Sequence, residues 1–336
     1  MKLNGLFRDG AVIAADEPLY VFGTGDGHVR VEFLGRAAEA DSEDGEWIVT
    51  LPPTEPGGPF TMDVIFPDER VTVRDLYAGR VYLVAGQSNA EFRLSESNTP
   101  PDEYEDDPLL RNYFVDRPWG EGDPLSSENG WYRAKADEVG DWTAIGYLTG
   151  RRIRRAVGGA VGIVSCYQGA SVIEAWLPEK DAKEFRLSDE DLYEDHTLDL
   201  FASFNQDGKI YREMLSGVSK FSFTGVVWYQ GESDSTVPEA NIYDRELARF
   251  IETVRRDGKN DRLPFAVVQI ADADYRKTFD PDGWIGIQKA QERAARDVPR
   301  VSLVVSRDIS ETVNLHPVTK TLLCDRIAGA LVAFEK

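Results

Sequence analysis

Ser88 stands where a hydroxyl group could act as a nucleophile. It follows the apolar run 81–85, and Gly86 between them allows a sharp turn. In open α/β sheets, ligand chemistry gathers outside the carboxyl ends of the strands. A serine that merely caps the next helix would leave the same pattern. Ser88 is therefore a candidate nucleophile only if the chain also supplies a base.

His316 is the candidate base. A serine hydroxyl attacks an ester at neutral pH when a general base takes its proton, and histidine is the usual choice. Of the three histidines, His28 lies in a β-rich N-terminal region and His196 lies in an acidic stretch. His316 follows an apolar run and precedes Pro317, which suits the first turn of a helix. Elimination leaves His316, although a surface-loop histidine would look the same.

Acyl transfer also needs hydrogen-bond donors for the negatively charged oxygen that develops. The candidates are the backbone N–H groups of Ser88 and Gly169 and the side-chain amide of Gln230. Gly169 has no Cβ, so a substrate can approach its N–H closely. Ordinary turn geometry for Gly169 and a core amide for Gln230 are the alternatives. Gln87 and Glu232, which stand near these residues, are expected to contact the substrate.

Apolar segments predict the strands that position these residues. The segments are 81–85, 161–165, 225–229, 265–270 and 301–305. Amphipathic segments that predict helices alternate with them, at about 141–157, 198–216, 238–257, 283–297 and 317–334. Buried-type strands alternating with helices indicate a parallel sheet covered on both faces. We therefore expect an α/β fold with a flavodoxin-like, five-stranded parallel sheet and the candidate residues at its carboxyl edge.

The pattern divides the chain into two regions. Residues 1–75 carry short β-type runs separated by Gly and Pro turn signals, which predicts a small N-terminal β-sandwich domain. Residues 76–336 are expected to form the α/β domain. Two long acidic segments within it, about 91–140 and 177–197, are interpreted as insertions that overhang the carboxyl edge of the sheet.

Composition restricts the partners. The chain has 59 acidic and 38 basic residues and a formal net charge of −21. Because such a field repels phosphate backbones and anionic lipids, we expect no nucleic acid and no membrane as partner. The N-terminus has no secretory pattern and no apolar run is long enough to cross a membrane, from which we expect a cytoplasmic protein. Oligomeric state is left open, a homo-oligomer included.

The sequence predicts no cofactor and no metal site. Its two cysteines, Cys166 and Cys324, are far apart and lie in apolar surroundings. They are expected to be buried, unpaired side chains rather than metal ligands or a disulfide. Acidic residues between 272 and 282 lack the spacing of a calcium loop.

Four strings resemble the SGNH-hydrolase superfamily, and within it the sialate O-acetylesterase family with its related carbohydrate acetylesterases. They are Gly-Gln-Ser-Asn at 86–89, Gly-Ala-Ser-Val-Ile-Glu-Ala-Trp at 169–176, Trp-Tyr-Gln-Gly-Glu-Ser at 228–233 and Leu-His-Pro at 315–317. The resemblance implies a three-layer sandwich and a metal-independent serine esterase that removes O-acetyl groups from sugars. It assigns the nucleophile to Ser88, the base to His316 and the oxyanion donors to the three groups named above.

The chain departs from the family pattern beside the base. Many relatives have Asp two residues before the histidine, where this chain has Asn314. An amide can orient an imidazole but cannot stabilise an imidazolium by charge. Glu311 or Asp308 could supply the carboxylate, Asn314 could orient the ring, or a Ser–His pair could suffice. We predict Glu311.

The resemblance implies a substrate that is an acetylated sugar, such as sialic acid, or an oligosaccharide. Trp119, Trp131 and Trp176 are candidates for stacking on sugar faces, with core packing as the alternative. A non-catalytic carbohydrate-binding protein on the same scaffold is one other function, motivated by the missing Asp at position 314. An esterase of other acyl esters is the second, and lipid chains would need an apolar groove.

Overall fold

Strand β8 (Arg70–Gly86) runs through the middle of the molecule. The computed structural model describes residues 1–120, 123–187, 199–272, 280–311 and 314–335. The apolar second half of β8 is buried, as the sequence predicts. It pairs in parallel with β11 (Val161–Tyr167) on one side and with β12 (Gly225–Tyr229) on the other.

The central sheet extends from these three strands in both directions. Beyond β12 lie β13 (Phe265–Val268) and β14 (Val301–Val304), and beyond β11 lie β9 (Asp107–Phe114) and β10 (Trp131–Ala134). Only β10 is antiparallel to its neighbour among these strands. The five predicted strands follow the order β11-β8-β12-β13-β14, which is the order of flavodoxin-like sheets. A mixed α/β fold with a large central sheet is thus confirmed.

Strand β9 is a parallel strand that the sequence analysis missed. It lies within 91–140, which we interpreted as an insertion, and it pairs with β11. Its pattern is unusual because Arg111 and Asn112 are buried within it. The Arg111 guanidinium donates to the carbonyl of Gly10, and Asn112 accepts a hydrogen bond from Ser165 at 2.7 Å. Polar residues with such partners can be buried in a strand, but they hide it from a search for apolar runs.

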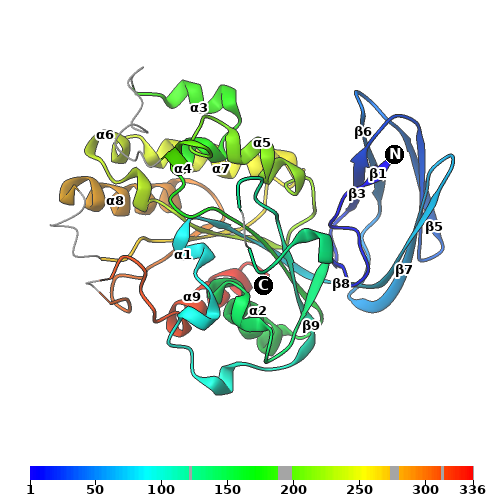
Figure 1. Ribbon diagram of the computed structural model, residues 1–336, viewed down its shortest axis with the longest axis horizontal. Coiled ribbons are helices and arrows are strands. Elements are labelled where there is room, and N and C mark those ends of the chain that lie inside the picture. The colour runs from blue at the N-terminus through cyan, green and yellow to red at the C-terminus, as the bar shows by residue number, and fades with distance from the viewer. Residues whose placement is uncertain (121–122, 188–198, 273–279, 312–313, 336) are drawn as a thin grey trace.

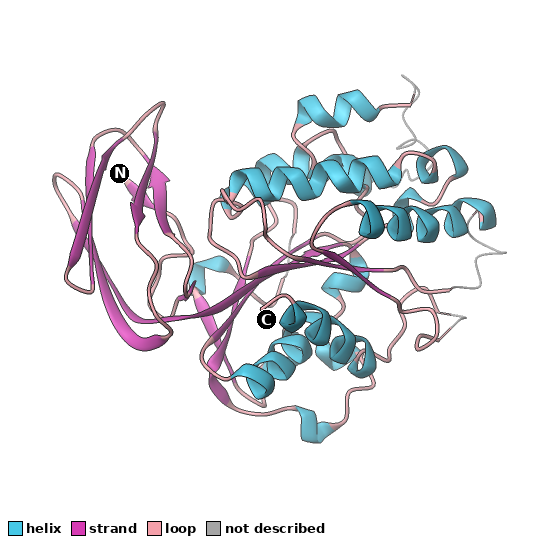
Figure 2. Cartoon of the chain, turned by 180° about the vertical axis from the view of Figure 1, so that it is seen from behind, coloured by secondary structure: helices cyan, strands magenta, loops and turns pink. Residues whose placement is uncertain are grey.

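Helices cover both faces of the sheet (Figure 1). On one face α2 (Ala144–Val157) packs against α9 (Thr321–Ala333). The opposite face carries α3 (Glu179–Phe185), α4 (Asp199–Ala202), α5 (Lys209–Glu213), α6 (Val237–Ala240), α7 (Tyr243–Asp257) and α8 (Pro281–Asp297). The view from behind shows the sheet between the two layers (Figure 2). The helix predicted over 198–216 is broken into α4, α5 and a 3₁₀ turn, and the helix predicted over 238–257 is divided into α6 and α7, whereas the other three predicted helices are present.

Short helices occupy several connections. α1 (Ser88–Glu91) follows β8 directly. The 3₁₀ helices are η1 (Leu94–Glu96), η2 (Pro101–Glu103), η3 (Ser127–Asn129), η4 (Val139–Asp141), η5 (Ile173–Trp176), η7 (Leu215–Gly217) and η8 (Glu232–Asp234). α1, η5 and η8 each follow the carboxyl end of a central strand, so they bring the candidate residues to one edge of the sheet.

The N-terminal region consists of β-strands. One antiparallel sheet contains β1 (Lys2–Leu3), β3 (Leu19–Thr24) and β6 (Glu46–Leu51). The strands β2 (Val12–Ala14), β4 (His28–Phe33), β5 (Arg36–Asp41) and β7 (Gly57–Ile65) join the first half of β8. The boundary expected after residue 75 falls inside β8, which passes from this region into the central sheet. The division into two domains stays a prediction.

Two further expectations concern side chains and membrane spans. Cys166 and Cys324 are both buried and unpaired, as expected. Across the described ranges, no helix has the length and apolar character that a membrane crossing requires.

Candidate active site

Ser88 is held at the tip of β8 by the close approach of the neighbouring parallel strand β12. Gly86 has φ of +138°, and a Cβ at this position would lie 2.1 Å from the carbonyl oxygen of Tyr229. Only glycine fits such a contact at such an angle. The chain can therefore turn directly into α1, where Ser88 is the first residue and half buried.

Ser88 and His316 meet as predicted. The Nε2 atom of His316 lies 2.8 Å from Oγ of Ser88, although 228 positions separate them in the chain. The imidazole lies beside the ring of Phe92, with 6.2 Å between ring centroids. Asn314 accepts the backbone N–H of His316 at 3.1 Å, so it orders the backbone of the loop rather than the imidazole. A nucleophile and a base within hydrogen-bond distance are the essential pair for covalent catalysis.

The surroundings keep His316 in its basic form. Burial lowers the pKa of His316 below its usual value, and the positive charge of Lys320 lowers it further. The carboxylates of Glu96 and Glu91 act in the opposite direction. A neutral imidazole at neutral pH is the form that can accept the proton of Ser88.

The structure does not bring Glu311 to the imidazole, in contrast to our prediction. Its carboxylate accepts hydrogen bonds from the hydroxyl and the backbone N–H of Thr319 instead. Asp308 forms an ion pair with Arg326 at 2.6 Å. Among the described residues, which exclude 312 and 313, no carboxylate is hydrogen-bonded to Nδ1 of His316. The loop folds so that its acids stabilise the approach to α9, and within the described part of the chain Ser88 and His316 form a pair without a third member.

Gly169 lies beside Ser88, but its N–H is occupied. A Cβ on Gly169 would lie 3.7 Å from Cβ of Ser88, which places the two residues in contact range. The Gly169 N–H donates to the Glu91 carboxylate at 2.9 Å, and Arg117 donates to the same carboxylate at 2.8 Å. Sequence reasoning missed Glu91 and Arg117. The available signal was that Glu91 follows Ser88 by three residues on α1, which puts both on the same side of that helix.

Gln230 is not available as an oxyanion donor in this structure. It is fully buried, and its amide donates to the carbonyl of Ser171 at 2.9 Å and to the carboxylate of Asp234. Its side-chain oxygen accepts the hydroxyl of Tyr243 at 2.7 Å. All polar atoms of the side chain therefore have partners within the core. Gln230 is thus a buried core amide, which was the alternative to an oxyanion donor.

Gln87 and Glu232 hold the site together rather than face a substrate. Both are almost completely buried. Gln87 accepts the backbone N–H groups of Gly231 and Ser233, at 3.2 and 3.3 Å. Glu232 accepts the side-chain amide of Asn89 at 2.7 Å. These bonds tie the loop after β12 to the start of α1, which fixes the position of Ser88.

The three tryptophans have different environments. Trp176 is fully buried, donates to the hydroxyl of Ser171 and packs edge-on against Trp228, so it is a core residue and not a sugar platform. Trp131 is also buried, and its indole N–H donates to the carbonyl of Leu6. Trp119 is partly exposed, and its indole N–H donates to the side-chain oxygen of Gln168, the residue before Gly169, at 2.6 Å.

Lys320 is a third residue that the sequence analysis missed. It is fully buried, and its ammonium group donates to Oδ1 of Asn89 at 2.9 Å. It also lies over the rings of Phe92 and Tyr229, at 4.9 and 5.6 Å from their centroids. Burial lowers its pKa to about 8. Its position, directly before an apolar helix and four residues after His316, was the signal for a buried cation next to the site.

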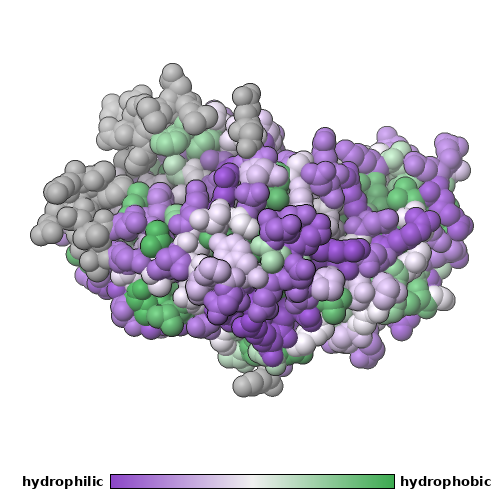
Figure 3. Space-filling view, turned by 60° about the horizontal axis from the view of Figure 1, so that its bottom comes forward, coloured by the Kyte–Doolittle hydropathy of each residue, from purple (hydrophilic) through white to green (hydrophobic). Residues whose placement is uncertain are grey.

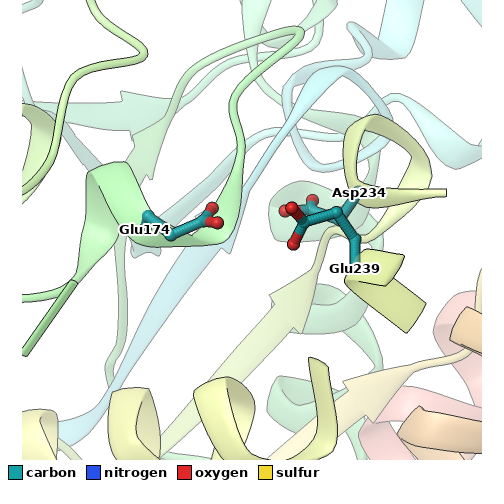
Figure 4. A group of neighbouring side chains, drawn as sticks. All are labelled: Glu174, Asp234 and Glu239. Carbon is teal, nitrogen blue, oxygen red and sulfur yellow. The ribbon is translucent and has the colours of Figure 1, made fainter. Parts of the chain in front are cut away.

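The other sequence candidates lie elsewhere. His28 is an exposed residue of β4 in the N-terminal region, where its imidazole contacts Asp41 at 2.9 Å. His196 lies outside the described residues. No metal site is predicted from the sequence, yet the structure gathers carboxylates of Glu174, Asp234 and Glu239, a set that could hold a metal ion (Figure 4).

A serine and a histidine that meet at the carboxyl edge of a parallel sheet define the class of Ser–His hydrolase sites. The chain belongs to the carbohydrate esterase, sialic acid-specific acetylesterase family, whose family model matches residues 78–332. This confirms the resemblance carried by the four sequence strings. The match covers every site residue described above.

Individual relatives agree with this assignment. The chain is 23% identical to human sialate O-acetylesterase over 339 residues, and 24% identical to the mouse protein over 281 residues. These alignments cover 90% and 70% of this chain, but only 64% and 51% of the relatives. The chain thus spans less than two thirds of the length of these curated relatives.

Solved structures also match. A carbohydrate acetylesterase from Xanthomonas citri is 28% identical, with a TM-score of 0.80 over 98% of this chain and 74% of that chain. An Arabidopsis thaliana protein is 18% identical, with a TM-score of 0.51 over 76% of this chain and 98% of that chain. The second match shows a shared fold only.

Proposed function

We propose that this chain is a serine esterase that removes O-acetyl groups from acetylated sugars, sialic acid included. The observation that carries the proposal is the 2.8 Å contact between Nε2 of His316 and Oγ of Ser88. The names of the human relative and of the Xanthomonas citri structure support the substrate class. The proposed fold is the SGNH three-layer sandwich over residues 76–336, beside a β-sandwich domain of residues 1–75.

The first half of the reaction forms an acetyl-enzyme. Oγ of Ser88 attacks the acetyl carbonyl carbon while Nε2 of His316 takes the hydroxyl proton. The carbonyl oxygen becomes negatively charged, and the backbone N–H of Ser88 donates to it. This N–H is the first in α1 and has no acceptor within the helix. His316 then returns the proton to the sugar oxygen, which leaves as an alcohol.

The second half releases acetate. A water molecule enters beside the imidazole, gives a proton to His316 and attacks the acetyl carbon on Ser88. The bond between the acetyl carbon and Oγ breaks, and Oγ regains the proton. Within the described ranges, no third residue is hydrogen-bonded to the imidazole of His316. Phe92 and the loop at Asn314 therefore orient the ring.

Glu91 controls the second oxyanion donor. In the structure its carboxylate accepts the N–H of Gly169, so the substrate oxygen and Glu91 compete for the same donor. We propose that the acetyl group displaces this carboxylate, which keeps its ion pair with Arg117. Gly169 and Ser88 then form a two-donor oxyanion hole.

The surface favours a polar substrate over a lipid. The face in Figure 3 is largely hydrophilic, and its apolar residues form small separate groups. The exposed large apolar residues in the described part of the chain are Leu34, Leu187, Val237, Val305 and Leu322, which are widely separated in sequence. A long acyl chain would need a continuous apolar groove. Trp119 is the proposed stacking residue for a sugar ring.

A carbohydrate-binding protein without turnover is the second candidate. The observation that favours it is the Glu91 carboxylate on Gly169, in a site where no described carboxylate is hydrogen-bonded to His316. Brief incubation with p-nitrophenyl acetate, followed by mass spectrometry of the intact chain, separates the two. The proposal expects one acetyl group, located on Ser88 and lost in Ser88→Ala. Absence of both acetylation and p-nitrophenol release would favour the binding protein.

A further inference from the structure

A group of buried carboxylates lies next to the site but has no role in the proposed reaction. Glu174 comes from η5, Asp234 from η8 and Glu239 from α6, and their carboxylate oxygens lie within 4.8 Å of one another. Figure 4 shows Glu174 pointing from one side toward Asp234 and Glu239 on the other. The three residues are 9%, 1% and 6% exposed. We call them the carboxylate triad.

A fourth acid provides an independent indication of a ligand. Glu246 of α7 is 0% exposed, and neither of its carboxylate oxygens has a hydrogen-bond partner. Burial raises its pKa, and the nearby charges of the carboxylate triad raise it further. Oε2 of Glu174 also lacks a partner. A buried polar atom without a partner costs free energy, so such atoms indicate a missing ligand.

Three of the four acids have no basic partner in the described part of the chain. Glu174, Asp234 and Glu246 form no ion pair with Lys or Arg anywhere in the described ranges. Arg245 lies close enough to lower the pKa of Glu246, but less than burial and the neighbouring acids raise it, and Asp207 adds negative charge near Glu174. Buried carboxylates in proteins are normally paired, protonated or bound to a cation.

The donor set and its size fit one type of ion. All donors are carboxylate oxygens, which hard divalent cations prefer. Ca²⁺ binds oxygen at 2.3–2.6 Å, so ligands on opposite sides lie about 4.6–5.2 Å apart, whereas for Mg²⁺ this distance is about 4.0–4.2 Å. The donor oxygens of the triad all lie within 4.8 Å of one another, a spacing that one ion can bridge, and the longer and more variable Ca²⁺–oxygen distances suit it better than the rigid octahedron of Mg²⁺. Asp234 is already oriented, because its Oδ1 accepts the backbone N–H of Ile173 at 3.0 Å.

We propose that Glu174, Asp234 and Glu239, with Glu246 beside them, bind one Ca²⁺ ion. The ion joins the segment after β11, the segment after β12 and the helices α6 and α7. These segments hold in place Gly169 and the loop that Gln87 contacts. The ion therefore stabilises the region behind the active site. The role is structural, and its test does not depend on the esterase reaction.

The first experiment uses the wild-type chain. Protein stripped with a chelator is dialysed against Ca²⁺, and bound calcium and Tm are measured. We expect one calcium per chain and, well above Kd, a Tm higher by about 5 °C than in chelator. An equal Tm in both buffers with no bound calcium would overturn the proposal, because it would mean that protons neutralise the carboxylates.

Two variants on α7 form a matched pair. Glu246→Gln removes the buried charge, and Glu252→Gln removes an exposed one on the same helix. Glu246→Gln should weaken calcium binding at least about tenfold and abolish the Tm increase, while its Tm in chelator stays equal or rises because repulsion is relieved. Glu252→Gln should behave like wild type. Normal calcium binding by a folded Glu246→Gln variant would show that Glu246 is not a ligand. If the variant does not fold, the comparison of wild-type protein with and without Ca²⁺ tests the proposal.

Discussion

The carboxylate of Glu91 accepts the backbone N–H of Gly169 at 2.9 Å, directly beside Ser88. A negative group thus occupies the place where the proposed reaction develops a negative oxygen. Like charges repel, and both oxygens compete for one donor. The activity of the site therefore depends on how readily this carboxylate leaves Gly169.

Glu91→Gln should raise kcat by about threefold or more, because a neutral amide competes less with the oxyanion and does not repel it. The measurement is kcat for p-nitrophenyl acetate at a pH where the rate has reached its plateau. Glu96→Gln is the matched control, since Glu96 also raises the pKa of His316 but contacts Arg93 instead of Gly169. A kcat for Glu91→Gln more than tenfold below wild type would show that the carboxylate assists the reaction.

Lys320→Met should move the acidic limb of the pH–rate profile to higher pH. In the wild type, burial and the charge of Lys320 lower the pKa of His316, so activity should persist below pH 6.5, the ordinary value for histidine. Lys320 is charged in this range because its pKa is about 8. Removing the charge raises the pKa of His316, and a larger fraction of the base is then protonated at a given acidic pH.

Lys289→Met, an exposed site on α8, should leave that profile unchanged. Circular dichroism should confirm that Lys320→Met is folded, since Asn89 loses a donor. A profile for folded Lys320→Met that coincides with wild type would mean that the lysine does not act on the base.

Glu311→Gln should change kcat/KM less than about threefold, because its carboxylate binds Thr319 and does not reach His316. Asn314→Ala should lower kcat/KM more, by about tenfold, because Asn314 accepts the backbone N–H of His316 and so holds the loop that carries this base. Both variants are compared with wild type by kcat/KM and Tm. A hundredfold loss in Glu311→Gln with unchanged Tm would restore our sequence prediction of a Ser–His–Glu triad.

Ser88→Ala and His316→Ala should each lower kcat by several orders of magnitude. The double variant should be little worse than either single variant, because the two residues act as a unit in one proton transfer. The three rates, measured with one ester substrate, form a double-mutant cycle. Losses that multiply would show that the residues act in separate steps.

The elements that carry the site were predictable from the sequence because their signals are local. Runs of apolar residues mark the strands, and glycine at 86 marks the turn before Ser88. His316 could be found by elimination among three histidines. A parallel sheet brings the ends of distant strands to one edge, so the meeting of Ser88 and His316 follows from the strand pattern.

Side-chain partners were much less predictable, since they depend on packing between distant segments. Gln230 and Trp176 lie in strings typical of the family, yet both side chains point into the core. Glu311 is close to His316 in sequence, but the loop turns its carboxylate to Thr319. Glu174 and Asp234 are 60 positions apart, and no spacing rule joins them. Arg111 made β9 hard to recognise, because a charged residue is not expected in a buried strand and its partner, Asp75, is distant in the sequence.

Acetate release from acetylated sugars tests the central claim most directly. Wild type and Ser88→Ala are incubated with acetylated sialic acid, xylan fragments and mannan fragments, and p-nitrophenyl acetate and octanoate serve as reference esters. The account predicts acetate from at least one sugar with wild type, none above background with Ser88→Ala, and faster hydrolysis of the acetyl than of the octanoyl ester. Release of no acetate from any sugar by a folded wild-type chain, or equal release by Ser88→Ala, would contradict it.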